Sequence, residues 1–183
     1  MRKQIRSGDL LSFRPCCNWY RPWSYWTWLI ALTNKERICH TAMACWWGEN
    51  LMVVQMTSSP TRIVLLSEYV KKYSGKIAVS RPLVKRGFKR LGAIDRMVRI
   101  TEKPYGWMRI LLLGLTHTFS GGLVWPNPAD DDKGSKWPPV CSEAYSRSMR
   151  LSGFDPVIGR ADSKTEPHHL FESPRMKPLF TLV

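Results

Sequence analysis

Apolar positions along the first half of the chain occur in short runs rich in β-branched and aromatic residues, separated by turn-forming residues, and this pattern predicts strands. The predicted strands are Leu10–Phe13, Arg37–Trp47, Leu51–Thr57, Pro60–Leu66 and Gly75–Ser80. The second and third are joined by Gly48-Glu49-Asn50, a connection typical of a hairpin. The pattern therefore favours an antiparallel sheet.

Helical spacing of apolar residues appears elsewhere. Trp19, Trp23 and Trp26 recur at intervals of four and three residues, which predicts one helical face. The predicted helices are Trp19–Leu32, Val84–Thr101, Tyr105–Thr118 and Val140–Leu151, with a short turn at Glu68–Tyr73. The last of these ends before Gly153, a residue suited to a helix C-terminus. Strands and helices together predict an α+β fold.

A chain of 183 residues suits one domain with a single core, so we expect one domain over 1–183. Residues 1–6 are expected to be a flexible lead-in, and residues 120–139 a long loop before the last helix. Residues 156–183 are expected to be an irregular C-terminal extension, with an edge strand at Leu179–Val183.

Charge narrows the range of partners. Lysine and arginine number 28 against 14 acids, which gives a formal charge of +14. Such a surface favours nucleic acid, anionic lipid or an anionic polymer such as cell wall. Since no recognised RNA or DNA motif accompanies the charge, the composition alone does not select nucleic acid.

Cysteine usage and hydropathy indicate a compartment. The five cysteines form no C-x-x-C pair and no disulfide framework, so we expect reduced thiols. The N-terminus lacks the apolar stretch of a signal peptide, and runs such as Ile110–Leu115 are too short to cross a bilayer. We therefore expect a cytoplasmic protein, or a virion-associated one if a phage encodes it. Oligomeric state is left open.

Two segments carry candidate chemistry. His40 lies in the apolar run Ile38–Met43, and Cys141 lies where the proline-rich loop becomes a helix. A helix start lowers a thiol pKa, and a neighbouring imidazolium lowers it further. If the fold brings His40 to Cys141, the pair has the components of an activated cysteine nucleophile.

The order of several motifs resembles a known family. The motifs are Gly8-Asp9-Leu10-Leu11-Ser12-Phe13, Cys39-His40-Thr41-Ala42, Val53-Val54-Gln55-Met56, Arg81-Pro82 and Val140-Cys141-Ser142-Glu143-Ala144. In this order they resemble the circularly permuted branch of the NlpC-type papain-like cysteine hydrolases, which includes YiiX-like proteins and, more distantly, lecithin:retinol acyltransferase-like enzymes. The resemblance spans roughly residues 5–175. It implies a small antiparallel barrel-like sheet packed on the nucleophile-bearing helix.

The same resemblance implies catalytic roles. Cys141 is the expected nucleophile, His40 the general base, and Gln55 the residue that orients the imidazole. The family commonly has glutamate where this chain has Gln55, and an amide fixes orientation without stabilising the imidazolium by charge. Thr57 lies on the same strand face as Gln55 and is an alternative orienting residue.

Oxyanion stabilisation is expected from the backbone N–H of Cys141 and a second donor. Ser142 and Tyr145 are candidates by proximity. The Gly8-Asp9 pair is expected to be structural.

No cofactor or metal is expected. The acids Asp130–Asp132 with Asn127 match no calcium loop, and the pair His168-His169 with Asp162 is poorly spaced for zinc. Cys39 and Cys45 are expected to pack away from His40, while Cys16-Cys17 and His117 lack catalytic context.

The resulting hypothesis is a cysteine peptidase or amidase that cleaves an amide bond, in a peptidoglycan stem peptide or related peptide. An isopeptide or a lipid ester remains open as the substrate, because permuted relatives cover both amidase and acyltransferase chemistry. The alternative is an inactive papain-like binding or virion structural module with a basic, tryptophan-rich surface. The substitution of glutamine for a carboxylate at Gln55 favours that alternative.

Overall fold

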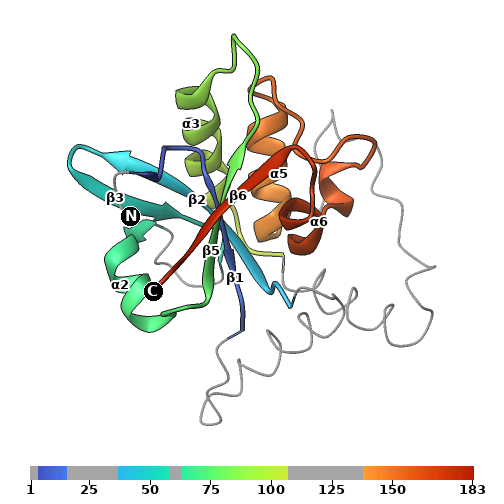
Figure 1. The fold of residues 1–183 in the computed structure, drawn as a ribbon. Coiled ribbons are helices and arrows are strands. Elements are labelled where there is room, and N and C mark those ends of the chain that lie inside the picture. Colours follow the sequence, from blue (N-terminus) through green and yellow to red (C-terminus); the bar gives the residue numbers. More distant parts are fainter. Residues whose placement is uncertain (1–3, 16–36, 58–62, 107–137) are drawn as a thin grey trace, which may run out of the picture.

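The computed structural model describes residues 4–15, 37–57, 63–106 and 138–183. Its centre is a six-stranded antiparallel sheet in the order β4-β3-β2-β1-β5-β6 (Figure 1). The strands are β1 (Leu10–Phe13), β2 (His40–Trp47), β3 (Asn50–Val54), β4 (Ile63–Leu65), β5 (Ile77–Pro82) and β6 (Met176–Leu182). The helices described are α2 (Leu66–Lys72), α3 (Arg90–Thr101), α5 (Cys141–Arg150) and α6 (Pro167–Phe171), with a 3-10 turn η2 (Asp162–Lys164).

The hairpin predicted between the second and third strands is present. Trp47 pairs with Asn50, which leaves a two-residue loop that begins with Gly48. Gly48 has a φ of 58°, a left-handed conformation that glycine adopts without steric cost. This turn sets the register of β2 against β3, and that register places Gln55 beside the start of β2.

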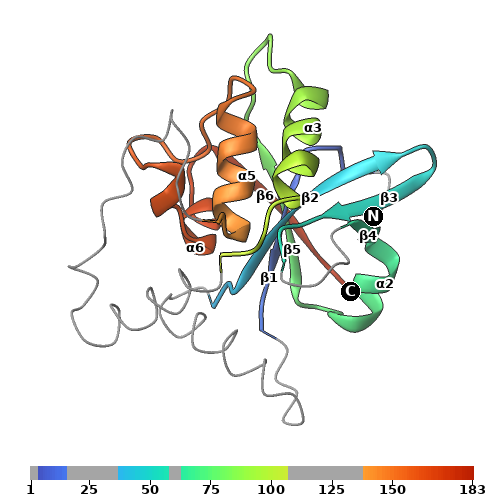
Figure 2. The same ribbon diagram turned by 180° about the vertical axis from the view of Figure 1, so that it is seen from behind.

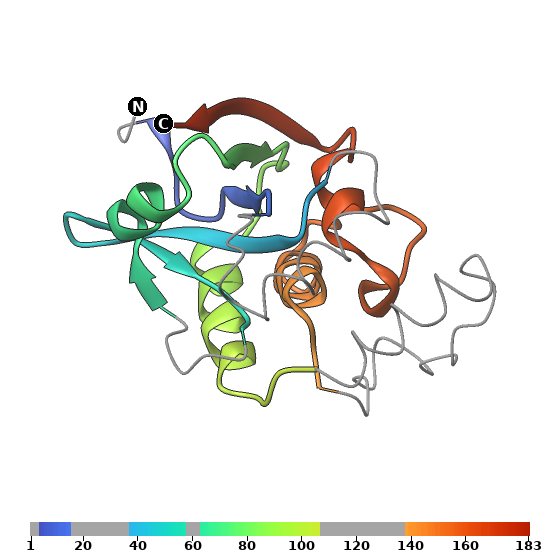
Figure 3. The ribbon, with the colours of Figure 1, turned by 90° about the horizontal axis from the view of Figure 1, so that it is seen from below.

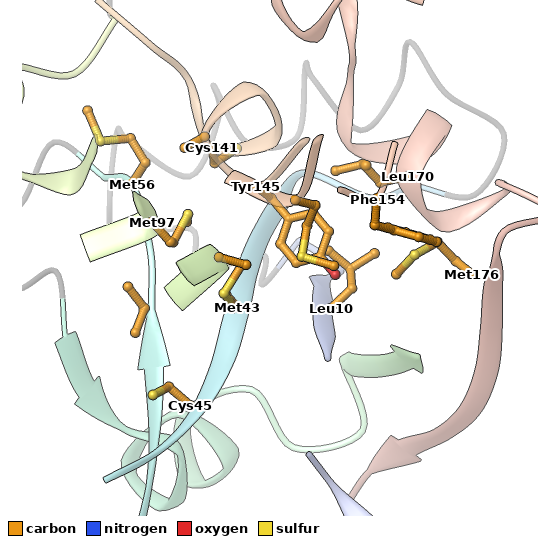
Figure 4. Packing of buried hydrophobic residues seen from close by; sticks show 14 residues of the cluster. Leu10, Met43, Cys45, Met56, Met97, Cys141, Tyr145, Phe154, Leu170 and Met176 are labelled. Carbon is orange, nitrogen blue, oxygen red and sulfur yellow. The ribbon is translucent and has the colours of Figure 1, made fainter. Parts of the chain in front are cut away.

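Helices cover both faces of the sheet (Figure 3). On one face α3, α5 and α6 enclose a core that includes Met43, Met97 and Tyr145 (Figure 4). On the other face α2 covers a second core around Leu11 and Val53. Alternate residues of each strand therefore feed two different cores.

Most predicted elements are found, and one helix begins later than predicted. Helix α3 starts at Arg90, whereas the apolar spacing predicted a start at Val84. Gly87 adopts a left-handed φ of 96°, and the Phe88 ring packs edge-on against Phe154 at 6.1 Å between centroids. The left-handed residue interrupts helical geometry, so residues 83–89 form a loop.

The sheet and the chain ends also differ from expectation. The sheet is open, because its order is linear with β4 and β6 at opposite edges, whereas a barrel requires the edges to pair. Part of the expected lead-in is structured, since Ile5 is only 2% exposed in the core below α2. The C-terminal extension is not irregular: it contains η2, α6 and the seven-residue β6, which pairs with β5.

Several sequence predictions fall outside the described residues. These are the helix Trp19–Leu32, Cys16-Cys17, His117, the acids Asp130–Asp132, and the predicted helix and loop across 107–137. Tyr105 and Gly106, which are described, are not helical. Within the described ranges, none of the helices combines the length and hydropathy needed to cross a membrane.

Candidate active site

Cys141 is the first residue of α5, one residue after the helix start predicted at Val140. Val140 precedes it in extended conformation, with φ −105° and ψ 172°, and supplies no side-chain cap. The first-turn N–H groups and the positive end of the helix dipole therefore lie beside the sulfur. Cys141 is 5% exposed and packs in the core between the sheet and the helices.

His40 is the first residue of β2 and is half-buried. Strand alternation puts its side chain on the face of Ala42, opposite to the face on which α5 packs. Because His40 is at the end of the strand, its imidazole still reaches Cys141, to which it is hydrogen-bonded. The Phe13 ring lies 5.4 Å away, centroid to centroid, and supports the imidazole from β1.

Gln55 follows the last residue of β3 and contacts His40. The His40 Nε2 and Gln55 Oε1 atoms lie 3.0 Å apart, and an amide oxygen only accepts, so Nε2 carries the proton. The amide nitrogen of Gln55 donates to the Tyr69 hydroxyl on α2 at 2.5 Å, which fixes the orientation of the amide. Nδ1 of His40 is thus left to exchange a proton with the thiol.

The electrostatics of the pair favour a reactive thiol. Burial raises the pKa of Cys141, but the charge of His40, the hydrogen bond to it, and the backbone N–H of Thr41 lower that pKa to about 7. Burial lowers the pKa of His40, whereas the thiolate charge and hydrogen bonds to Cys141 and Gln55 raise it above 6.5 overall. Near neutral pH the site therefore holds a substantial thiolate–imidazolium population.

Tyr105, which sequence analysis did not assign to the site, also contacts Cys141. Burial raises the pKa of Tyr105 well above 10, and the thiolate charge and hydrogen bond of Cys141 raise it further. The phenol thus remains a hydrogen-bond donor. Tyr105 had been predicted at the start of a helix, and nothing in the local sequence indicates its contact with a thiol 36 residues later.

Gly106 explains how Tyr105 approaches the nucleophile. Its N–H donates to the carbonyl oxygen of Pro139 at 3.1 Å, and a Cβ at this position would overlap the carbonyl oxygen of Pro138. Only glycine permits this backbone contact. The segment after α3 consequently lies against the proline pair that leads into Cys141, an approach visible below α5 in Figure 2.

We expect Gly106→Ala to disturb both stability and the site. The added methyl group overlaps backbone that cannot move freely, so the free energy of unfolding should fall by about 1–3 kcal/mol, measured by urea denaturation. Gly92→Ala is the matched control, because its nearest neighbour is the movable end of the Arg96 side chain. An equal loss in both variants would show that the contact with Pro138 is not special.

The two oxyanion candidates suggested by proximity have other partners. The Ser142 hydroxyl donates to the carbonyl oxygen of Thr165 at 2.6 Å, and the Tyr145 hydroxyl donates to that of Gly8 at 3.0 Å. Both hydroxyls therefore serve packing of α5. The Thr41 side chain, completely buried beside Cys141, was not assigned to the site by the sequence reasoning.

The Gly8-Asp9 motif has a structural role, as expected. Gly8 has a φ of 89° and its N–H donates to the carbonyl oxygen of Ala44 at 2.7 Å. Asp9 accepts the backbone N–H of Arg6 at 2.8 Å and pairs with Arg81 on β5. Because Tyr145 also donates to Gly8, this turn supports the helix that carries Cys141.

The other described cysteines have packing contacts. The Cys39 thiol donates to the carbonyl oxygen of Phe13 at 3.3 Å, and Cys45 belongs to the core beneath α3 and α5. Burial raises the pKa of Cys45, although a hydrogen bond with Ser7 opposes this. Cys45 is therefore a useful unreactive reference for Cys141.

Three side chains that could bind a metal ion lie close together outside the Cys141 site. The ligand atoms of Glu166, His168 and His169 lie within 4.8 Å of one another. Asp162, which the sequence analysis found poorly spaced for zinc with the histidine pair, accepts hydrogen bonds from Ser146 and Arg150. His169 Nδ1 accepts the N–H of Glu166 at 3.0 Å in a capping box, so its lone pair is already used to begin α6.

Comparison with known proteins finds a solved structure with a similar fold. No family model matches the sequence, and no curated protein matches it. The solved structure of the metalloprotein YiiX from Escherichia coli O157:H7 superposes with a TM-score of 0.58 at 15% identity. The alignment covers 97% of this chain and 98% of YiiX.

The chain is similar in fold to YiiX. At this identity the likeness to YiiX concerns the fold, and it extends across nearly the whole of both chains. The mixed α+β architecture with an open antiparallel sheet is consistent with a YiiX-like fold. A shared fold does not carry the roles of individual side chains from one protein to another.

Proposed function

We propose that this protein is a cysteine hydrolase of permuted papain-like type that cleaves amide bonds. The observation that carries the proposal is the contact of the Cys141 thiol, at a helix start, with a histidine whose far nitrogen is held by Gln55. The YiiX-like fold and the agreement of this arrangement with the motif order give further support.

The geometry suggests a sequence of steps. Nδ1 of His40 takes the thiol proton, and the sulfur of Cys141 attacks the substrate carbonyl carbon to form a tetrahedral intermediate. His40 returns the proton to the leaving amine as the C–N bond breaks, which leaves a thioester on Cys141. A water molecule, deprotonated by His40, then hydrolyses the thioester and regenerates the thiol.

The oxyanion has two candidate donors. The backbone N–H of Cys141 is one of the first-turn groups of α5 that lack an intrahelical acceptor. The phenol of Tyr105 is the second, because it stays protonated and reaches the sulfur that carries the tetrahedral centre. This assignment replaces Ser142 and Tyr145, whose hydroxyls are engaged elsewhere.

The favoured substrate is a peptide amide, such as a peptidoglycan stem peptide. The formal charge of +14 favours approach to an anionic cell-wall polymer, and the sequence resemblance indicates the same substrate class. The competing function is a binding module with an inactive site, favoured by the uncharged Gln55 beside His40. The reactivity of Cys141 separates the two.

The test is the pH profile of iodoacetamide alkylation at Cys141, located by mass spectrometry. The rate should rise with pH and reach half its maximum near pH 7, because the thiolate is the reactive form. In His40→Ala the imidazolium is lost, and burial then raises the pKa of Cys141. Alkylation of Cys141 below pH 7 should therefore slow about tenfold. This factor already allows for the greater nucleophilicity of a more basic thiolate.

Cys45 in the same digest provides the internal control, since its environment does not involve His40. If the Cys141 profile is unchanged by His40→Ala, the catalytic pair is not formed and the binding-module function is favoured.

Gln55→Glu should strengthen the pair. A carboxylate beside the imidazolium favours the charged form of His40 and with it the thiolate, so the alkylation midpoint should fall by about one pH unit. Tyr69 can reverse its hydroxyl to donate to the new carboxylate. The neutral control Gln55→Leu should raise the pH midpoint of Cys141 alkylation. Identical profiles for both variants would exclude Gln55 as the orienting residue.

A further inference from the structure

The end of the molecule opposite to Cys141 carries an exposed surface of mixed character. Cys141 begins α5, and Leu151 follows its last residue, about 15 Å away along the helix axis. The loop 83–89 projects beyond the helices at this end (Figures 1 and 2). We define the apical patch as Leu83, Lys85, Arg86, Lys89, Leu91 and Leu151.

Large aliphatic side chains in this patch face solvent. Leu91 is 81% exposed, Leu83 51% and Leu151 46%. Lys85, Arg86 and Lys89 are exposed between them along the same loop and helix start. Three exposed leucines interleaved with cations form an apolar and basic surface, and burial of such side chains against a partner is favourable.

Three contacts hold the patch together. The N–H of Lys89 donates to the carbonyl oxygen of Ser152 at 3.3 Å, which joins the start of α3 to the end of α5. The N–H of Leu83 donates to the carbonyl oxygen of Arg175 at 2.9 Å, and the Arg175 guanidinium lies 4.6 Å from the Phe154 ring centroid. The segments that carry the exposed leucines are therefore held in place by contacts with the rest of the fold.

The local charge is strongly positive. Residues 83–99 contain six lysines and arginines and a single acid, Asp95. Asp95 is paired with Arg99 at 2.9 Å, one turn farther along α3 and away from the loop. No acid therefore interrupts the cations of the loop itself.

We propose that the apical patch binds the surface of an anionic lipid bilayer. Lys85, Arg86 and Lys89 would contact the headgroups while Leu83 and Leu91 enter the interface. A nucleic-acid backbone would also attract the cations, but aliphatic side chains gain nothing from phosphates, whereas they are stabilised at a bilayer boundary. Attachment by this end leaves the Cys141 end facing away from the membrane.

The experiment measures sedimentation of the full chain with vesicles of phosphatidylcholine alone and of phosphatidylcholine containing one third phosphatidylglycerol. Binding is expected only to the anionic vesicles. Lys85→Ala/Arg86→Ala should weaken it by about tenfold or more, and Leu83→Ser/Leu91→Ser by a similar factor. Lys71→Ala/Lys72→Ala on α2 removes the same charge from another surface and should have little effect.

Three results would overturn the proposal. Equal weakening by the α2 and apical lysine variants would show attraction through net charge alone. No effect of the leucine variants, together with tight binding of a single-stranded RNA to the same cations, would indicate a nucleic-acid surface. Absence of binding to anionic vesicles would exclude the membrane directly. Cys141 alkylation should be unchanged in all patch variants, so this test is independent of the proposed hydrolase.

Discussion

Replacing Cys141 by alanine should abolish hydrolysis of soluble muropeptides, with kcat/KM reduced at least about a thousandfold, because Cys141 is the thiol that contacts His40 and would form the thioester. His40→Ala should lose a comparable factor, since without the base the buried thiol stays protonated near neutral pH. Product amines and carboxylates would be followed by mass spectrometry. The double variant should be no worse than either single one, because the two residues act as a unit.

Cys45→Ala is the matched control for these variants. It removes a buried thiol from the same core without touching His40, and it should keep activity within about twofold if the fold is retained. Retained hydrolysis in Cys141→Ala would contradict the proposed function. If the parent protein has a reactive Cys141 and still hydrolyses no muropeptide, a panel of peptide amides and esters would show which acyl group the site accepts.

Removing Arg81 should cause the largest loss of stability. Asp9 is completely buried, and Arg81 binds both of its oxygens, from Nη2 at 2.8 Å and from Nε at 3.1 Å. Arg81→Ala leaves this buried carboxylate without its paired cation, which should cost about 3 kcal/mol in the free energy of unfolding, measured with urea. Arg81 also donates to the carbonyl oxygen of Gln4, so the N-terminal turn should loosen with it.

Arg99→Ala provides the comparison, since it breaks the Arg99–Asp95 pair, which is largely exposed. That variant should unfold at the same urea concentration as the parent, because solvent screens the pair. Arg81→Lys keeps the charge without the two-point contact, so its free energy of unfolding should lie between those of Arg81→Ala and Arg99→Ala. Equal stability of Arg81→Ala and Arg99→Ala would mean that Asp9 finds water or another donor on loss of Arg81.

The effect of Arg81→Ala should reach the active site. The turn that contains Asp9 also accepts the Tyr145 hydroxyl through Gly8 and the Arg90 guanidinium through Ser7. These bonds connect the turn to α5, which carries the nucleophile, and to α3, which packs against α5. Alkylation of Cys141 in Arg81→Ala should therefore lose part of its low-pH reactivity while the variant is still folded.

Local sequence patterns were sufficient to predict many of the strands and helices. Strand β1 has the predicted bounds, Leu10–Phe13, because a Gly-Asp pair begins it and Pro15 lies just beyond it. Helix α5 is one residue shorter at each end than predicted, and Gly153 ends it with a φ of 96°. Apolar spacing predicted a helix from Val84, but the left-handed conformation of Gly87 keeps that segment in a loop.

The sequence by itself determined the helix start at Cys141, the strand that carries His40 and the hairpin that delivers Gln55, because each depends on neighbouring residues. Only the tertiary structure decided that these three side chains meet, since strand alternation alone directs His40 away from the face that α5 covers. It also brought Tyr105, Thr41 and Tyr69 to the site, through the Gly106 contact and the packing of α2. Contacts between residues so far apart in the chain depend on how α2, the sheet, and the layer of α3, α5 and α6 pack together. Local sequence patterns do not predict that packing.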